Sequence, residues 1–366
     1  MRTKRKSAAS PPITGSPHKR RKNTLPAPAF IWNPRTWVQV EEITDRVSVL
    51  KSKNNNKQLV VMKIMRVGVD SENDKRPLEI RALSLLPDCN RILKPLYFER
   101  TPANPGFSMA IFAHCPLGDL KQWKASQFDK KMFKPVPESF IWRFFIHMSQ
   151  ALNFIQNGVE PRREGQSPMI HRDIKPNNII VMENGTTYPS FKLHDFGCAM
   201  FYIEAKANRP AYCGTYEWQP PENPIINTEA AEVWALGACV HYLAKGKAPI
   251  GDRDDYKQAC QRVFDGDPPS AQKYNPRHRY YAAKVPREAI PINIPFREGP
   301  DGIGSRPPRQ YSGELNYWMM RCLSPEASTR ATAEQLITDM VPDAKSILQL
   351  MGGNAALTDL EIEVAA

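Results

Sequence analysis

The 366-residue sequence contains no apolar run that approaches the length needed to cross a membrane. Its N-terminus also lacks the features of a secretory signal peptide. The seven cysteines are odd in number and lack the spacing of a metal site, which argues against a disulfide framework. We therefore expect a soluble intracellular protein with no membrane partner. The length suits one large domain or two smaller ones, each with a proper core.

Acidic residues are absent from residues 1–40, which hold nine Lys or Arg, so most of the net charge of +12 lies there. Residues 1–35 are rich in Pro, Ser and basic side chains, and we expect a disordered basic tail because so few apolar groups cannot offset the ordering entropy. The charges form two clusters, residues 4–6 and 19–22, in the manner of a bipartite nuclear localisation signal. We expect a nuclear import receptor to bind residues 4–22, and the protein to be nuclear or nucleocytoplasmic.

The basic tail has other interpretations. A run of Lys and Arg can be a solvated segment or a non-specific nucleic-acid contact. The tail lacks the interleaved aromatic residues that suit base stacking, so nucleic acid is not the expected partner.

The main group of chemistry-bearing residues is His-Arg-Asp-Ile-Lys-Pro-Asn-Asn at residues 171–178, followed by Asp-Phe-Gly at residues 195–197. Phosphoryl transfer from a metal-bound nucleotide needs a carboxylate for the attacking hydroxyl and a cation for the moving phosphoryl group. Asp173 supplies such a carboxylate and Lys175 such a cation. We interpret both as catalytic residues.

Two further residues of these segments offer oxygen ligands for Mg²⁺. Asn178 carries a neutral amide oxygen and Asp195 a carboxylate, the hard ligands that Mg²⁺ prefers while it keeps waters and phosphate oxygens. Between them, apolar runs at 179–181 and 191–193 flank a turn at 183–185. This pattern predicts a hairpin that sets the two ligands side by side.

In their order and spacing, the two segments resemble the catalytic and metal-binding loops of the eukaryotic protein kinase superfamily. The resemblance implies an α+β, two-lobed protein kinase fold over residues 36–341. A small antiparallel β-sheet lobe with one regulatory helix would cover about 36–115 and a mainly helical large lobe about 116–341. Residues 342–366 would be a short C-terminal tail, acidic and mobile from Gly352. The implied activity is a serine/threonine protein kinase that transfers the γ-phosphoryl group of ATP, with Mg²⁺, to a protein hydroxyl.

The small lobe would supply the nucleotide site. Lys63, at the end of the apolar run 59–62, would hold the phosphates, with Glu79 of the periodic segment 77–83 as its partner. By the same resemblance three apolar residues would sandwich the adenine. These are Val47, Val61 and Ile180.

The glycine-rich loop of the family is missing, because the chain has no glycine between Gly15 and Gly68. Its three glycines, which normally let backbone amides approach the phosphates, would fall near Val40, Glu42 and Asp45. Side chains there would stiffen the loop, and the two acids would bring negative charge towards a triphosphate. We expect weaker ATP binding, slower catalysis or an unusual mode of phosphate binding.

Serine and threonine are absent between Cys198 and Cys213, in the activation segment. Arg172, which grips a phosphorylated loop in many kinases, therefore lacks the usual acceptor, and Glu204 is a candidate phosphate mimic. We expect activity that does not depend on Ser/Thr phosphorylation of this loop. Thr215, together with Lys175, favours serine/threonine specificity.

Two acidic residues of the large lobe match structural positions of the family. Glu222 would form an ion pair with Arg330, and Glu232, in place of the usual Asp, would cap the backbone of the catalytic loop. Residues 249–310 are longer than a minimal lobe needs and suit either a partner surface or an irregular loop. The alternative function is a pseudokinase or kinase-like scaffold with weak or no catalysis, favoured by the missing glycines and opposed by the complete set of catalytic residues.

Overall fold

The structure is a computed structural model, and it describes residues 30–67, 74–99, 106–130, 135–158, 168–293 and 311–365. Residues 33–366 form one compact unit, separate from Met1–Trp32. The predicted import signal at residues 4–22 and part of the expected partner surface, residues 294–310, lie outside the described residues.

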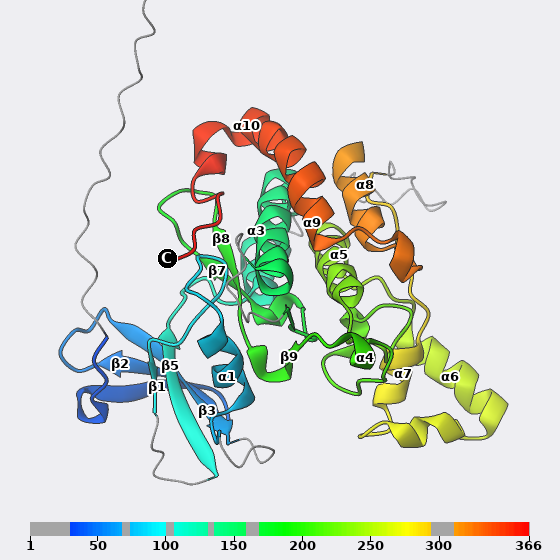
Figure 1. The fold of residues 1–366 in the computed structure, drawn as a ribbon, viewed down its shortest axis with the longest axis horizontal. Coiled ribbons are helices and arrows are strands. Elements are labelled where there is room, and N and C mark those ends of the chain that lie inside the picture. Colours follow the sequence, from blue (N-terminus) through cyan, green and yellow to red (C-terminus); the bar gives the residue numbers. More distant parts are fainter. Residues whose placement is uncertain are drawn as a thin grey trace, which may run out of the picture. The chain divides into compact units, whose positions relative to one another are not determined.

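The order of the described elements matches the expected two lobes (Figure 1). Strands β1 to β5 and helix α1 come first in the chain, and the long helices follow. The strands are β1 (Trp37–Thr44), β2 (Val47–Ser52), β3 (Leu59–Arg66), β4 (Tyr97–Phe98), β5 (Phe107–Ala113), β6 (Met169–Ile170), β7 (Ile179–Met182), β8 (Ser190–Leu193) and β9 (Met200–Phe201). The helices are α1 (Leu78–Leu85), α2 (Leu120–Lys124), α3 (Glu138–Asn157), α4 (Glu204–Ala207), α5 (Glu229–Lys245), α6 (Arg253–Phe264), α7 (Arg279–Lys284), α8 (Gly313–Cys322), α9 (Ala333–Gln335) and α10 (Val341–Leu357).

The small lobe is an antiparallel sheet in the order β1-β2-β3-β5-β4. A turn joins β2 to β3, and Ser52 Oγ caps it by accepting hydrogen bonds from the amide N–H groups of Asn54 and Asn55 at 3.2 Å each. The predicted regulatory helix is α1. It buries Glu79 together with Ile80 and Leu83.

The large lobe is built around α3, which is buried over most of its circumference and packs against α5, β8 and α10. Its large apolar side chains belong in a core, and Trp142, Phe144 and Phe145 are indeed fully buried. Gly158, at φ +76°, follows its last residue, and the Gly158 amide donates to the Phe154 carbonyl. The two-lobed α+β prediction is therefore confirmed.

The expectation of a free acidic tail from Gly352 is wrong for the described residues. Helix α10 continues to Leu357, and the following segment lies against the loop that joins α1 to β4. Arg91, fully buried, donates to the carbonyls of Asp359 and Glu361 at 2.7 and 2.8 Å. The backbone amide of Asn90 donates to the Glu363 carbonyl at 3.1 Å. Because these contacts are long-range, the local acidic composition did not reveal them.

The region expected to be an irregular loop or partner surface contains α6 and α7 in its described part. Both helices lie near the end of the activation segment, and α7 packs against Tyr216–Trp218. Among the described helices, none combines the length and the apolar character that a membrane span requires.

Candidate active site

The catalytic loop enters from β6 and is held at its start by Glu232 of α5. The Glu232 carboxylate accepts the backbone N–H groups of His171 and Arg172 at 2.8 Å each. The Glu in place of Asp therefore still caps both amides, as expected. Burial raises the pKa of Glu232 to about 7. Arg172 has a positive φ of 65°, so the two amide contacts stabilise a backbone conformation that side-chain-bearing residues rarely adopt.

The structure brings Asp173, Lys175 and Asn178 together. Lys175 Nζ contacts Asp173 Oδ2 at 2.8 Å, and Asn178 Nδ2 donates to the same oxygen at 3.0 Å. Lys175 Nζ also donates to Thr215 Oγ1 at 2.8 Å. One carboxylate oxygen is thus fixed by two donors, and the activation segment is joined to the catalytic loop through Thr215.

The other carboxylate oxygen of Asp173 has no hydrogen-bond partner within the described part of the chain. Gly214, at φ +72°, lies beside it. A Cβ at position 214 would lie 3.4 Å from Asp173 Oδ1 and only 2.4 Å from the Arg172 carbonyl oxygen. Glycine is therefore required at position 214, and Asp173 Oδ1 is buried beside it without a hydrogen-bond donor among the described residues.

The proposed metal ligands lie at the two ends of the β7–β8 hairpin, as the sequence predicts. The backbone N–H of His194 donates to the Asn178 carbonyl at 3.0 Å and draws the two ends together. Asn178 donates from its amide nitrogen to the Asp173 carbonyl and to Asp173 Oδ2, which leaves its amide oxygen, rather than the nitrogen, as the group that could bind a cation. Asp195 has a positive φ of 61°. One carboxylate oxygen and one amide oxygen are a donor set that fits Mg²⁺.

Lys63 contacts both carboxylates that sequence analysis assigned to the nucleotide site. Its Nζ lies 2.6 Å from Glu79 Oε2 and 2.8 Å from Asp195 Oδ1. Burial alone would lower the pKa of Lys63, but Glu79 and Asp195 together raise it, so the ammonium stays charged. Burial would likewise raise the pKa of Asp195, but Lys63 outweighs it and holds that pKa at about 2. The small and large lobes are therefore coupled by a fixed cation.

Strand register places two of the three predicted adenine contacts on the face that carries Lys63. Val47 pairs with Lys63 across β2 and β3, and directly opposed residues point to the same side. Val61 precedes Lys63 by two residues on β3, so alternation puts it on that side too. Ile180, on β7, is half-buried and packs against the same core as Val61.

The segment in place of the glycine-rich loop is a β-hairpin that turns at Asp45 and Arg46. Its register shifts twice, and Glu41 pairs with Val49 whereas Glu42 pairs with Ser48. Val49 lies on the face of Val47 and Val61, so it is Glu41 that shares this face. The expectation that Glu42 points towards the phosphates is corrected, because two bulges change the alternation along β1.

The activation segment is held by arginines, and the sequence analysis missed two of them. Arg172 donates to the Cys198 carbonyl at 2.7 Å and to Asn227 Oδ1 at 3.2 Å, and neither contact involves the candidate phosphate mimic. Arg279 Nη2 donates to the Gly214 carbonyl at 2.6 Å, and Arg287 donates to the Tyr216 and Gln219 carbonyls. Every residue carries a backbone carbonyl, so the acceptors of these hydrogen bonds cannot be recognised from the sequence. Only the many arginines in residues 249–310 could have pointed to these contacts.

The predicted ion pair between Glu222 and Arg330 is confirmed. Arg330 Nη1 and Nη2 lie 2.8 and 3.0 Å from the two carboxylate oxygens, in a bidentate arrangement. The Arg330 side chain is fully buried, and the guanidinium also lies over the Trp234 ring. Glu222 is about one quarter exposed. The pair thus joins the end of the activation segment to the body of the large lobe.

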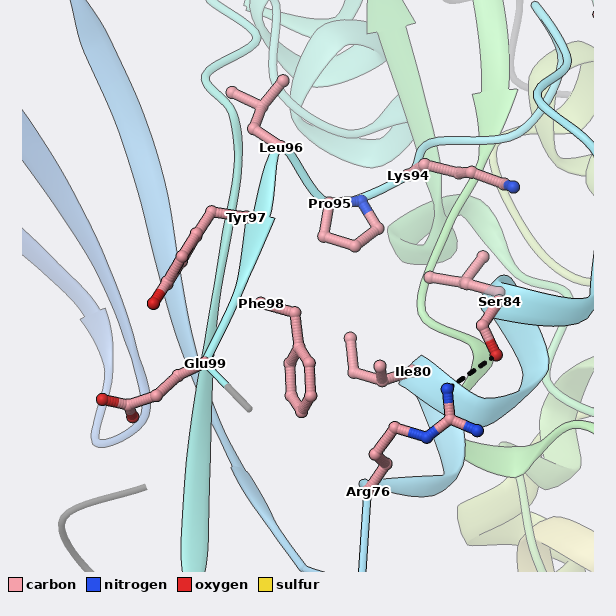
Figure 2. Close-up of a pocket in the computed structure, with 10 residues that line it drawn as sticks. Arg76, Ile80, Ser84, Lys94, Pro95, Leu96, Tyr97, Phe98 and Glu99 are labelled. Carbon is pink, nitrogen blue, oxygen red and sulfur yellow. Dashed lines mark hydrogen bonds between the residues drawn. The ribbon is translucent and has the colours of Figure 1, made fainter. Parts of the chain in front are cut away.

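A cavity of about 1050 Å³ lies apart from these residues, between α1 and residues 94–99. Figure 2 shows the Phe98 and Ile80 side chains facing one another across it, with Arg76 bonded to Ser84 at the rim. Both basic groups that line it have acidic partners, since Arg76 pairs with Asp74 and Lys94 with Asp88. The cavity borders the helix that carries Glu79 but contains none of the described catalytic side chains.

The model of the protein kinase domain family matches residues 46–341. The chain belongs to the protein kinase family. The match runs from the turn of the first hairpin to the start of α10, so this kinase chain carries both lobes.

Curated proteins with similar sequences are kinases of several kinds. The dual specificity mitogen-activated protein kinase kinase hemipterous of Drosophila melanogaster is 28% identical over 59% of this chain. The probable serine/threonine-protein kinase nek2 of Dictyostelium discoideum is 26% identical over 70% of it, and the human dual specificity mitogen-activated protein kinase kinase 7 is 25% identical over 58%. The kinase chain spans 17%, 57% and 47% of the lengths of these relatives, respectively.

Proposed function

We propose that this kinase transfers the γ-phosphoryl group of ATP to serine or threonine hydroxyls of proteins. The observation that carries the proposal is the asymmetry of the Asp173 carboxylate. Oδ2 is fixed by Lys175 and Asn178, and Oδ1 has no partner among the described residues. A buried acceptor without a donor is costly in free energy unless a ligand satisfies it. A substrate hydroxyl is such a donor.

The chemistry follows from the fixed charges. Asp173 accepts the proton of the attacking hydroxyl, and Lys175, hydrogen-bonded to Thr215, stabilises the negative charge that develops on the transferred group. Lys63, held by Glu79, orients the nucleotide phosphates. In this reaction class positioning and electrostatics supply most of the rate enhancement, and these residues supply both.

ATP and Mg²⁺ are the proposed cofactors. Val47, Val61 and Ile180 would contact the adenine, while Asn178 and Asp195 would hold the metal. Bound there, Mg²⁺ would neutralise phosphate charge and leave waters and phosphate oxygens in its other positions. Lys63 occupies only Asp195 Oδ1, which leaves the second carboxylate oxygen for the metal.

Serine/threonine selectivity rests on Lys175 and Thr215. The nek2 relative is named a serine/threonine-protein kinase, and the mitogen-activated protein kinase kinases are named dual specificity. The contact between Lys175 Nζ and Thr215 Oγ1 fixes the segment that receives the substrate residue close to Asp173, which suits a short hydroxyl side chain.

The experiment is a transfer assay with radiolabelled Mg·ATP and a generic basic protein, followed by hydrolysis of the product and separation of its phosphoamino acids. We expect phosphoserine and phosphothreonine. A product that contains only phosphotyrosine would contradict the proposed specificity. ATP-dependent thermal stabilisation without any transfer would favour the pseudokinase alternative.

We also propose nuclear or nucleocytoplasmic localisation through residues 4–22. The support is the pair of basic clusters at residues 4–6 and 19–22. A fluorescent protein fused to residues 1–25 should accumulate in nuclei, and the same fusion with residues 19–22 changed to alanine should not. Equal distribution of both fusions would contradict this proposal.

A further inference from the structure

Two cysteines flank the part of the activation segment that lacks serine and threonine. Cys198 directly follows Asp-Phe-Gly at 195–197, and Cys213 directly precedes Gly214 and Thr215. Both thiols are free and half-buried, and they are hydrogen-bonded to each other. The contact brings together residues that are 15 positions apart in the sequence.

The backbones of both cysteines are held by side chains of the same site. Arg172 Nε donates to the Cys198 carbonyl, and Gln219 Nε2 donates to the Cys213 carbonyl, each at 2.7 Å. The Gly214 amide also bonds to the Cys198 thiol. The two sulfur atoms therefore meet because the folded segment holds them there.

The surroundings give the two thiols different acidities. The hydrogen bond from Cys198 lowers the pKa of Cys213 to about 7, assisted by Arg172 and Arg279 and opposed by burial and by Asp173. The hydrogen bond to Cys213, burial and Asp173 raise the pKa of Cys198 well above its usual range. Cys213 is thus the more acidic thiol of the pair, and Cys198 is the neutral thiol beside it.

The other cysteines offer no equivalent pair. Cys89, Cys239 and Cys322 are buried, and burial raises the pKa of each. Burial also raises the pKa of Cys115, to about 11. Thiolate character and accessibility decide which cysteine reacts first with an oxidant. Cys213 is half-buried rather than buried, and its pKa is lowered.

We propose that Cys198 and Cys213 are an oxidative modification site, at which a hydroperoxide converts the thiol pair into a disulfide that lowers phosphoryl transfer. The Cys213 thiolate attacks the peroxide O–O bond and becomes a sulfenic acid, and the leaving hydroxide takes a proton to form water. Cys198 then attacks the sulfenic sulfur, and its thiol proton leaves with the hydroxyl as a second water. The two cysteines together lose two electrons, and the peroxide gains them.

The disulfide would act on catalysis through Gly214. Covalently bonded sulfur atoms lie closer than hydrogen-bonded thiols, so the Cys213 backbone must move towards Cys198. Movement of Gly214 is restricted on one side, because a Cβ built there would lie 2.4 Å from the Arg172 carbonyl oxygen and 3.4 Å from Asp173 Oδ1. The shift is transmitted to Thr215 and its contact with Lys175. Small displacements of a positioned group lower rates by about tenfold or more.

The test treats the full-length kinase with hydrogen peroxide and maps disulfides by mass spectrometry of the non-reduced digest, a readout that does not depend on kinase activity. We expect a peptide linked through Cys198 and Cys213, together with a loss of transfer of about tenfold or more that dithiothreitol restores. ATP-dependent thermal stabilisation should persist, because Lys63 and Glu79 lie outside the linked segment. Each activity is expressed relative to the same variant after reduction.

The single-cysteine variants separate the two roles. In Cys198→Ser, peroxide should leave Cys213 as a sulfenic acid that dimedone traps, whereas in Cys213→Ser the remaining Cys198 should stay unmodified. Cys260→Ser, a half-buried cysteine of α6, is the matched control and should respond to peroxide like the wild type. Alkylation of Cys213 should follow a midpoint near pH 7. Absence of the linked peptide in the peroxide-treated wild type, or its reduction without recovery of activity, would overturn the proposal.

Discussion

Arg287 Nη2 donates a hydrogen bond of 2.8 Å to the backbone carbonyl of Tyr216. The same guanidinium donates to the Gln219 carbonyl at 2.8 Å and to the Val285 carbonyl at 2.7 Å. Burial lowers the pKa of Arg287 to about 10, still well above neutral pH, so the group remains charged among these oxygens. A permanent cation from residues 249–310 therefore fixes the segment that a phosphate fixes in many kinases.

We predict that Arg287→Ala lowers the free energy of unfolding by about 2–4 kcal/mol, because several buried carbonyls lose their donor. It should also lower kcat/KM for the protein substrate. Thermal unfolding and steady-state kinetics measure both quantities. Arg277→Ala, an exposed residue of the same region, is the control and should change neither. Equal effects of the two substitutions would contradict the role of Arg287.

Activity should not need phosphate on the activation segment. Phosphatase treatment of the purified kinase is expected to leave transfer unchanged, because Arg172 already binds the Cys198 carbonyl and Asn227. Loss of activity with the removed phosphate mapped to residues 198–213 would contradict this expectation.

The glycine-free hairpin predicts unequal effects of two neighbouring acids. Glu41 shares the face of Val47 and Lys63, whereas Glu42 pairs with Ser48 on the other face. Removing the Glu41 charge should lower the KM for ATP by about twofold, a modest effect because solvent screens an exposed charge. Glu42→Gln is the matched control for Glu41→Gln. A larger effect of Glu42→Gln would mean that the strand register is different.

The ion pair between Glu222 and Arg330 predicts a large cost when one partner is removed. Arg330→Met should destabilise the fold by about 3 kcal/mol, because it leaves a carboxylate in a largely buried site. Arg253→Gln breaks the exposed pair with Glu217 and should cost less than about 1 kcal/mol. Chemical denaturation measures the free energy of unfolding of both variants. A similar loss of unfolding free energy in the two variants would show that burial of the Arg330 ion pair does not raise the cost of breaking it.

The C-terminal segment should stabilise the kinase domain. Deletion of residues 358–366 exposes Arg91, which is fully buried in the intact chain and loses the Asp359 and Glu361 carbonyls. We expect a free energy of unfolding lower by at least about 2 kcal/mol. Glu363→Gln keeps the backbone contacts and is the control. Unchanged stability on deletion would support the free tail that composition suggested.

Sequence reasoning located the parts of the site that local patterns encode. Asp173, Lys175, Asn178 and Asp195 stand in short motifs that resemble those of protein kinases. That resemblance implied both the two-lobed fold and the Lys63–Glu79 contact, which the structure shows.

What sequence reasoning missed depends on contacts between distant segments. The bulges that turn Glu41 towards the nucleotide face depend on pairing with β2. Arg279 and Arg287 bind backbone carbonyls, which every residue carries. The docking of Asp359 beside Arg91 joins residues more than 260 positions apart. None of these contacts has a local signature, so their discovery required the folded chain.

The most direct test of the central claim is single-turnover transfer of the γ-phosphoryl group from Mg·ATP to a generic basic protein. Wild type, Asp173→Asn and Lys63→Met would be compared. Wild type should transfer, and each substitution should lower the rate by about 10²-fold or more. Asp173→Asn should still be stabilised thermally by ATP. Wild type that is stabilised by ATP but transfers nothing, or Asp173→Asn that transfers as fast as wild type, would contradict a catalytic role for Asp173.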